Sequence, residues 1–91
     1  MKKVKWKRSG DNTLKEHYFF DKESGLHFEI RNVLFWTLNI RDGNILYQGR
    51  FNYLKDAKHV AEQILNEEIK PTKYLAKFTP NGMILPKERT A

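Results

Sequence analysis

The side chains best suited to metal binding or acid–base chemistry in this sequence are its three histidines, because the chain contains no cysteine. Two of them, His17 and His27, fall in segments that are expected to pair as a hairpin. If Phe20 pairs with Leu26 across that hairpin, His17 lies opposite Glu29, with His27 on the same face. A His-Glu-His group can hold zinc. The alternative, which we favour, is an exposed sheet face with one ion pair, so no metal site is predicted.

Motifs of the common enzyme classes are missing from the sequence. There is no glycine-rich phosphate loop of the Walker or Rossmann pattern, and there is no cysteine nucleophile. We therefore predict that the protein is not an enzyme, has no catalytic residue and uses no cofactor.

The aromatic content is high for a chain of 91 residues, with six phenylalanines, four tyrosines and two tryptophans. A single helix covers only one face of a sheet, so about half of these rings must lie elsewhere. Phe19 and Phe35 are expected on the opposite face, beside Leu46, Gln48 and Arg50. Such a surface suits stacked bases or a protein interface. The alternative is that terminal strands or a second subunit cover it.

The net charge of +6 is concentrated at the two ends of the sequence. Residues 1–8 contribute +5 and residues 70–91 contribute +4, whereas residues 9–69 contribute −3. Clustered lysine and arginine side chains are typical of phosphate-binding surfaces. The predicted nucleic-acid-binding residues are Lys3, Lys5, Trp6, Lys7, Arg8, Arg31, Phe35, Arg41, Arg50, Lys73 and Lys77.

The elements that must position these residues begin with strands. The segment VLFWTLNI (33–40) predicts a central strand that leads into a two-residue loop at Asp42-Gly43. That loop pairs Ile40 with Ile45 and keeps one apolar face continuous. The apolar face of the central strand is expected to carry Leu34, Trp36, Leu38 and Ile40.

One helix is predicted at about residues 53–69, with Asn52 as its N-cap and Pro71 beyond its end. Its apolar stripe comprises Leu54, Ala57, Val60, Ala61, Ile64 and Leu65. The segment KYLAKF (73–78) is consistent with a last strand, and the residues after it with either a short return strand or a tail. MKKVKWKR (1–8) alternates lysine with Val4 and Trp6, which fits either a basic arm or a half-buried edge strand.

Together these elements predict one α+β domain over residues 1–91. An antiparallel sheet of three to five strands is packed on one face by the single helix, in the order β-β-β-β-α with an optional final strand. The basic segment 1–8 and the segment 79–91 are candidates for flexible ends. If both ends joined the same edge of the sheet, their lysines would form one basic ridge.

The stretch GRFNYLKDAKHVAEQIL, which follows the Asp-Gly hairpin, resembles the last strand and helix of two nucleic-acid-binding families. One is the arm-type DNA-binding domain of phage and transposon integrases, and Phe51, Leu54 and Ala57 match its turn and helix. The other is the double-stranded-RNA-binding domain, whose final helix begins with a basic cluster and an Ala-Lys pair, matched by Lys55, Ala57 and Lys58. The resemblance implies a sheet backed by a helix that binds nucleic acid.

The favoured function is therefore a non-enzymatic nucleic-acid-binding module, with DNA as the expected ligand. The resemblance to these two families covers about residues 34–67. A strand-turn-helix of this kind is also common in small bacteriophage proteins, and the size of the chain and the lack of a catalytic motif suggest a small accessory protein of a bacteriophage or mobile element. The alternative function is a phage-encoded protein that binds and inhibits a host protein through the exposed aromatic face. A homodimer through the open sheet face or the edge strand at 44–50 is compatible with either.

No apolar run approaches the roughly 18 residues that a membrane-spanning helix needs. The basic start is not followed by the apolar stretch of a secretory signal. We therefore expect a cytoplasmic protein with no membrane partner, located in the host cytoplasm if a phage encodes it.

Overall fold

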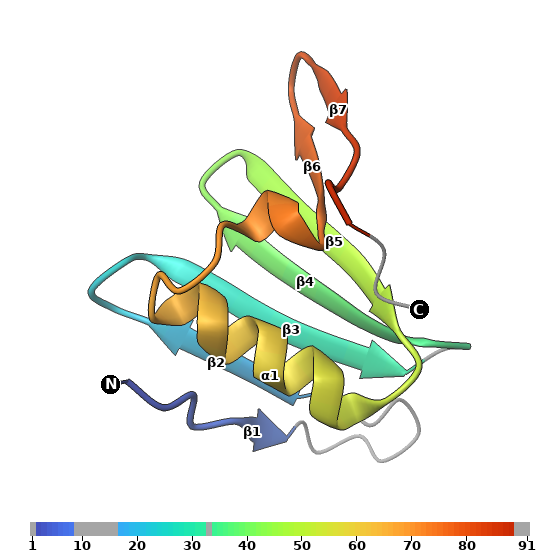
Figure 1. Cartoon of the computed structure of the whole chain (residues 1–91). Coiled ribbons are helices and arrows are strands. Elements are labelled where there is room, and N and C mark those ends of the chain that lie inside the picture. Colours follow the sequence, from blue (N-terminus) through green and yellow to red (C-terminus); the bar gives the residue numbers. More distant parts are fainter. Residues whose placement is uncertain (1, 9–16, 33, 89–91) are drawn as a thin grey trace.

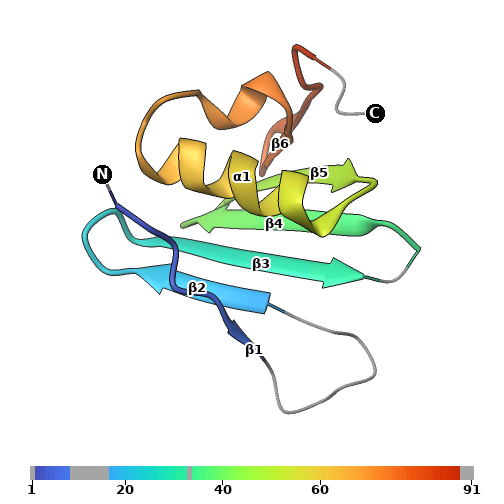
Figure 2. The same cartoon turned by 60° about the horizontal axis from the view of Figure 1, so that its bottom comes forward.

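The computed structural model describes residues 2–8, 17–32 and 34–88. The described residues form one antiparallel sheet whose seven strands are ordered as in the sequence, with a single α-helix on one face (Figures 1 and 2). The strands are β1 (Lys7–Arg8), β2 (His17–Asp21), β3 (Leu26–Asn32), β4 (Trp36–Asp42), β5 (Ile45–Phe51), β6 (Ala76–Thr79) and β7 (Gly82–Ile84), with α1 (Leu54–Leu65) and the short 3₁₀ helix η1 (Pro71–Lys73) between β5 and β6. The predicted α+β class is confirmed, with more strands than the three to five expected.

The β4–β5 hairpin turns through Gly43 and Asn44, so Asp42 pairs with Ile45 and Ile40 pairs with Tyr47. The predicted loop was one residue too early, and the pairing partners differ by two positions. Gly43 has φ +60°, the conformation needed at the first loop position of a type II′ turn, which glycine adopts without steric cost. Because side chains alternate with a period of two, an offset of two leaves each residue on its predicted face.

The strand register of the β2–β3 hairpin differs from the prediction by one residue. This offset changes more than the two-residue offset of the β4–β5 hairpin does. Asp21 pairs with Leu26, and Phe20 therefore pairs with His27 rather than with Leu26. Asp21 closes the turn: its carboxylate accepts hydrogen bonds from the Ser24 hydroxyl at 2.6 Å and the Ser24 amide at 3.2 Å. An offset of one moves every side chain of a strand to the other face.

Leu34 and Phe35, which precede β4, form a bend rather than part of a strand. Asn32 pairs with Trp36, which starts β4, and Leu34 is 88% exposed. The prediction that Leu34 belongs to the apolar face was therefore wrong, because the strand begins at residue 36 and not at residue 33.

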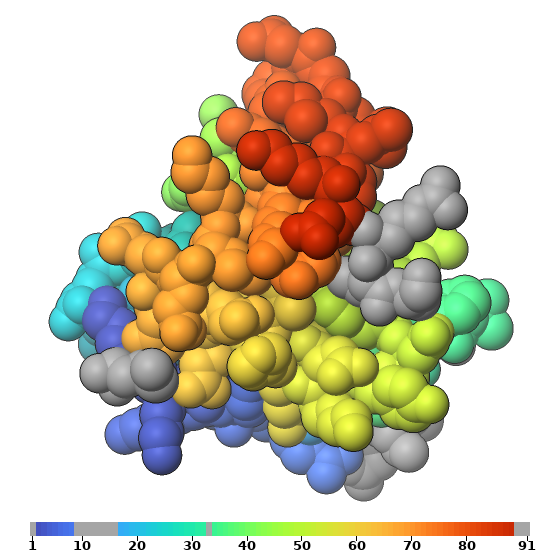
Figure 3. Space-filling view, in the orientation of Figure 1, coloured from blue at the N-terminus to red at the C-terminus, as the bar shows by residue number. Residues whose placement is uncertain are grey.

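The core lies between α1 and the sheet. The predicted apolar stripe of the helix is confirmed, with Leu54 half-buried and the other five residues buried. Burial of each large apolar side chain stabilises the fold by about 1.5–3 kcal/mol. The stripe packs on the buried sheet residues Phe28, Ile30, Leu38, Ile40 and Phe51. In the space-filling view, α1 and the segment that follows it cover this face (Figure 3).

Both ends of the helix differ from the prediction. Tyr53, not Asn52, occupies the N-cap position and makes no side-chain capping bond. The helix ends at Leu65, four residues early, because Glu67 has φ +57° and cannot continue it. The side chain of Asn66 donates to the carbonyl of Glu62 at 2.9 Å and so caps the helix from within its last turn.

The N-terminal segment runs along the same face of the sheet as α1 (Figure 2). Val4 and Trp6 pack against the core, with the Trp6 ring edge-on to Phe28 at a centroid distance of 6.5 Å. Lys3 and Lys5 are exposed between them. The alternating pattern of residues 2–8 is thus that of a half-buried segment, and within these residues only Lys7 and Arg8 join the sheet.

The two basic ends lie at opposite edges of the sheet. β1 pairs with β2 at one edge, whereas β6 pairs with Leu46–Gln48 of β5, and β7 forms the other edge. Their lysines therefore do not merge into one ridge. Because Leu46–Gln48 pair with β6, the segment 44–50 is not an open edge along its whole length, as one of the two predicted routes to a homodimer assumed.

Candidate nucleic-acid interface

The face of the sheet opposite α1 carries the arrangement of interest, and we call it the open sheet face. Strand pairing assigns one residue in two along each strand to it. Its described residues are Lys7, Tyr18, Phe20, His27, Glu29, Arg31, Thr37, Asn39, Arg41, Leu46, Gln48, Arg50, Ala76, Phe78 and Met83. Within this set, one lysine and three arginines stand against a single carboxylate, so the face is basic although the middle of the chain is acidic.

An aromatic stack occupies one end of this face. The rings of Phe20 and His27 stack with centroids 4.2 Å apart and planes inclined by 26°. Phe20 is 45% exposed and Arg41 is the pairing partner of His27 on the next strand. A shallow hollow of about 410 Å³ lies beside the stack, and its lining includes Tyr18, Phe20, His27, Glu29, Asn39 and Arg41.

A row of hydrogen-bonded polar side chains crosses the middle of the face, and we call it the amide row. Gln48 donates from Nε2 to Oδ1 of Asn39 at 2.8 Å. Asn39 in turn donates from Nδ2 to Oε1 of Glu29 at 3.5 Å, a long hydrogen bond. Arg31 pairs with the same carboxylate oxygen at 3.0 Å. The row therefore holds a carboxylate and two amides in fixed positions between the arginines.

A second aromatic contact lies at the other end of the face. The guanidinium carbon of Arg50 is 5.8 Å from the ring centroid of Phe35, within the range of a cation–π interaction. Arg50 pairs with Thr37, and Thr37 pairs with Arg31, so both arginines belong to one row. Phe35 lies in the β3–β4 turn and is 45% exposed.

Five predicted site residues therefore lie on this face or at its end. Arg31, Arg41 and Arg50 are on the face, Lys7 is on it at β1 opposite Tyr18, and Phe35 is at its end. Phe19 was wrongly assigned to this face. Because of the one-residue offset of β2, Phe19 packs against Phe28 on the helix side, with centroids 6.0 Å apart.

Tyr18 and Phe20 take the place of Phe19, and the sequence prediction missed both. They are the functional candidates that the predicted β2 register placed on the other face of the sheet. The signal that could have placed Tyr18 and Phe20 is the hydrogen bond from the Ser24 hydroxyl to the Asp21 carboxylate in the turn, since this bond fixes where β2 ends.

The remaining predicted residues lie elsewhere. Arg8 pairs with His17 and so lies on the helix side of β1, while Trp6 belongs to the core margin. Lys73 lies in η1, 3.7 Å from a carboxylate oxygen of Glu88 and 5.2 Å from the Tyr74 ring centroid. Lys77 pairs with Tyr47 and also lies on the helix side.

The histidine–glutamate cluster considered from the sequence does not form. His17 is buried on the helix side, with its ring centroid 6.2 Å from that of Trp36, while His27 and Glu29 lie on the open sheet face. Burial, with Lys58 and Arg8 nearby, lowers the pKa of His17 below its ordinary value. The described residues contain no group of three metal-binding side chains.

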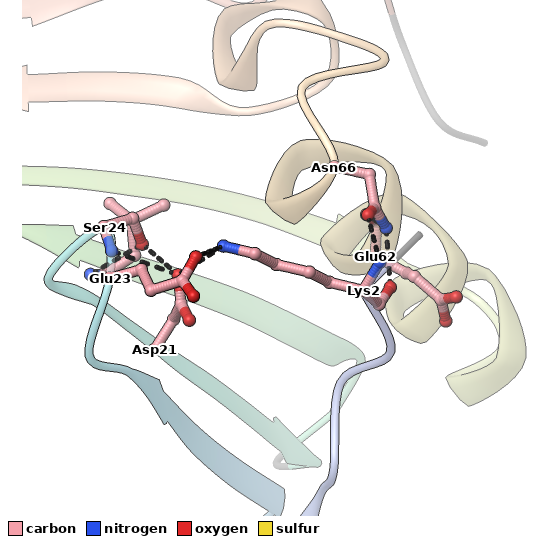
Figure 4. A network of polar contacts seen from close by, with 7 residues as sticks. Lys2, Asp21, Glu23, Ser24, Glu62 and Asn66 are labelled. Carbon is pink, nitrogen blue, oxygen red and sulfur yellow. Dashed lines mark hydrogen bonds and ion pairs between the residues drawn. The ribbon is translucent and has the colours of Figure 1, made fainter.

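The charge of Lys2 is engaged in contacts within the protein, so not every terminal lysine is available to bind a ligand (Figure 4). Its Nζ forms an ion pair with Glu23 and lies 3.8 Å from Oδ2 of Asp21. The hydrogen bond with Glu23 raises the pKa of Lys2, and hydrogen bonds from Ser24 lower the pKa of Asp21. These contacts join the N-terminal segment to the β2–β3 turn.

Comparisons of the chain with protein-family models, with curated proteins and with solved structures find no match. The geometry of the open sheet face is therefore what indicates a function for this protein. None of the helices among residues 2–8, 17–32 and 34–88 is both long and apolar enough to cross a membrane.

Proposed function

We propose that the protein is a non-enzymatic nucleic-acid-binding module whose interface is the open sheet face. The observation that carries the proposal is the combination on one surface of four cations with exposed Tyr18, Phe20 and Phe35, against a single carboxylate among the face's described residues. Cations neutralise phosphates and release counterions, and aromatic faces stack on bases.

Arginine suits this role better than lysine does. Its planar guanidinium forms bidentate hydrogen bonds to phosphate and also stacks on flat rings. Arg31 and Arg50 lie in one row, two strands apart at about 4.8 Å per strand, and Arg41 lies four residues along the intervening strand, so the sheet holds all three at fixed spacings. Lys3 and Lys5 extend the positive charge from the β1 edge along the N-terminal segment.

The experiment is a salt titration of oligonucleotide affinity by fluorescence anisotropy. Arg41→Gln combined with Arg50→Gln removes two charges from the face. Lys55→Gln combined with Lys70→Gln removes two charges from exposed positions away from it and serves as the matched control. The slope of log affinity against log salt should be about 1.4 to 1.8 less steep in the face variant.

Two results contradict the proposal. One is undetectable binding to any oligonucleotide at low salt. The other is an equal loss of affinity in the two double variants, since this would mean that total charge, rather than the open sheet face, determines binding.

A protein partner is the second candidate function, and one observation favours it. Met83, Ile84 and Leu85 are consecutive apolar residues on or beside edge strand β7, each exposed by more than half. Exposed apolar side chains on an edge strand suit pairing with another chain. Inhibition of a host protein would require a stoichiometric, nuclease-resistant complex that Ile84→Ser and Leu85→Ser abolish.

A further inference from the structure

We propose that the nucleic acid bound by the open sheet face is single-stranded, with an unpaired base stacked on the Phe20–His27 pair and its edge facing the amide row. This inference rests on the proposed function and names the ligand class of the same surface. It follows from what the side chains beside the hollow can contact.

The stacked pair offers a flat apolar surface. Two rings 4.2 Å apart present an outer face on which a third flat ring can continue the stack, and Phe20 is partly exposed. The adjoining hollow of about 410 Å³ lies within the range of roughly 300–1,000 Å³ that small-ligand sites occupy. In a duplex the base faces are covered by neighbouring base pairs, so only an unpaired base can use such a stack.

The hollow also contains groups that recognise the edge of a base. Glu29 and Asn39, two members of the amide row, line it together with Phe20 and His27. Amide and carboxylate groups donate to and accept from the edges of unpaired bases. The hydrogen bonds of Asn39 with Gln48 and Glu29 fix its amide orientation before a ligand arrives, which lowers the entropic cost of binding.

Cations lie where a phosphate backbone would pass. Arg41 lines the same hollow, while Arg31 and Arg50 lie in the row that is four residues further along the strands, about 13 Å away at ~3.3 Å per residue. A strand that stacks one base on Phe20 and His27 can therefore bring its following phosphates to the arginines. This distance suits an extended chain of a few nucleotides.

The test compares the affinities of oligo-dT, oligo-U and a dA·dT duplex of the same length. Phe20→Leu and His27→Leu remove aromatic stacking and keep an apolar side chain of similar size. Tyr53→Leu, at an exposed ring at the start of α1, is the matched control. Thermal denaturation of each variant shows whether its fold is intact.

We expect either single strand to bind at least about ten-fold more tightly than the duplex. Phe20→Leu should weaken single-strand binding by between about five-fold and a hundred-fold, and leave duplex binding and the Tyr53→Leu control unchanged. The dT and U arms distinguish a DNA from an RNA ligand.

Duplex binding that equals or exceeds single-strand binding, or folded Phe20→Leu and His27→Leu variants with unchanged affinity, would overturn this inference. The proposed function would still stand if Arg41→Gln with Arg50→Gln lowered the affinity. Absence of binding to all three oligonucleotides would overturn both.

Discussion

The side chain of Asn66 bonds to both backbone polar groups of Lys2, which lies 64 residues earlier in the chain. The Lys2 amide donates to Oδ1 of Asn66 at 2.6 Å, and Nδ2 of Asn66 donates to the Lys2 carbonyl at 2.7 Å. The Asn66 side chain thus forms the same pair of hydrogen bonds with Lys2 that a neighbouring strand would form. These bonds hold the N-terminal segment against the end of α1 (Figure 4).

Asn66→Ala should lower the free energy of unfolding by about 1–3 kcal/mol, because it removes these two bonds and the bond to Glu62. Amide exchange of residues 2–6 should accelerate more than exchange in β3 and β4. Asn52→Ala, at an exposed asparagine, is the matched control. Equal stability losses in the two variants would contradict the role assigned to Asn66.

Gly49 allows β5 to pack closely against the segment leading into β6. A Cβ at this position would overlap Cδ2 of the fully buried Leu75 and lie 3.1 Å from the Tyr74 carbonyl oxygen. Gly49→Ala should therefore cost about 1–3 kcal/mol of stability through overpacking.

Leu75→Val removes the Cδ atoms and gives a direct check of this explanation. The double variant should lose less stability than the sum of the two single variants, as measured by urea denaturation. Strict additivity would show that the overlap between positions 49 and 75 is not the cause.

Stability should fall as the pH decreases below about 6.5. His17 is buried beside Trp36, with Arg8 of β1 and Lys58 of α1 as its charged neighbours, and its pKa is lowered in the folded state. The unfolded chain then binds a proton at a higher pH than the folded chain does, so the stabilisation present above pH 6.5 is lost as the pH falls toward the lowered pKa.

Urea denaturation between pH 7.5 and 4.5 measures this effect. His17→Gln should flatten the pH dependence in this window. Asp21, whose pKa is also lowered, contributes only below about pH 3.8, outside the window. An unchanged profile in His17→Gln would contradict the assignment.

The accuracy of the sequence predictions depended on whether each register error was an even or an odd number of residues. In the β4–β5 hairpin an offset of two residues kept Ile40 on its predicted face. In the β2–β3 hairpin an offset of one exchanged Phe19 with Tyr18 and Phe20. The helix stripe was predictable because it repeats over three turns, but the end at Glu67 was not, since glutamate seldom adopts a positive φ.

The arginines of the candidate site were identified from sequence because β3, β4 and β5 kept their faces. The aromatic stack was missed because the position of Phe20 depends on the β2 register. The contact between Asn39 and Gln48 in the amide row was missed because it depends on the β4–β5 register, which differed from the prediction by two positions. The strand role of the segment 82–84 was left open, since a three-residue strand carries little periodicity.

Substitution of the N-terminal lysines tests whether their charge contributes to nucleic-acid binding, and it leaves the fold intact. Deleting residues 1–8 would remove Val4 and Trp6 from the core margin and confound binding with stability. Lys3→Gln with Lys5→Gln should leave the melting temperature unchanged and make the salt slope of single-strand binding less steep by up to about 1.4. An unchanged salt slope would show that Lys3 and Lys5 do not contact the nucleic acid and that the interface is confined to the sheet.

The central claim, that the open sheet face is the nucleic-acid interface, is tested most directly by a ¹H–¹⁵N titration of the whole chain with oligo-dT. The account predicts that the largest shift changes map to the side-chain amides of Asn39 and Gln48, the Arg41 Nε–H and the backbone of Phe20 and His27. Shift changes concentrated on the exposed side of α1, around Lys55 and His59, with the open sheet face unchanged, would contradict it.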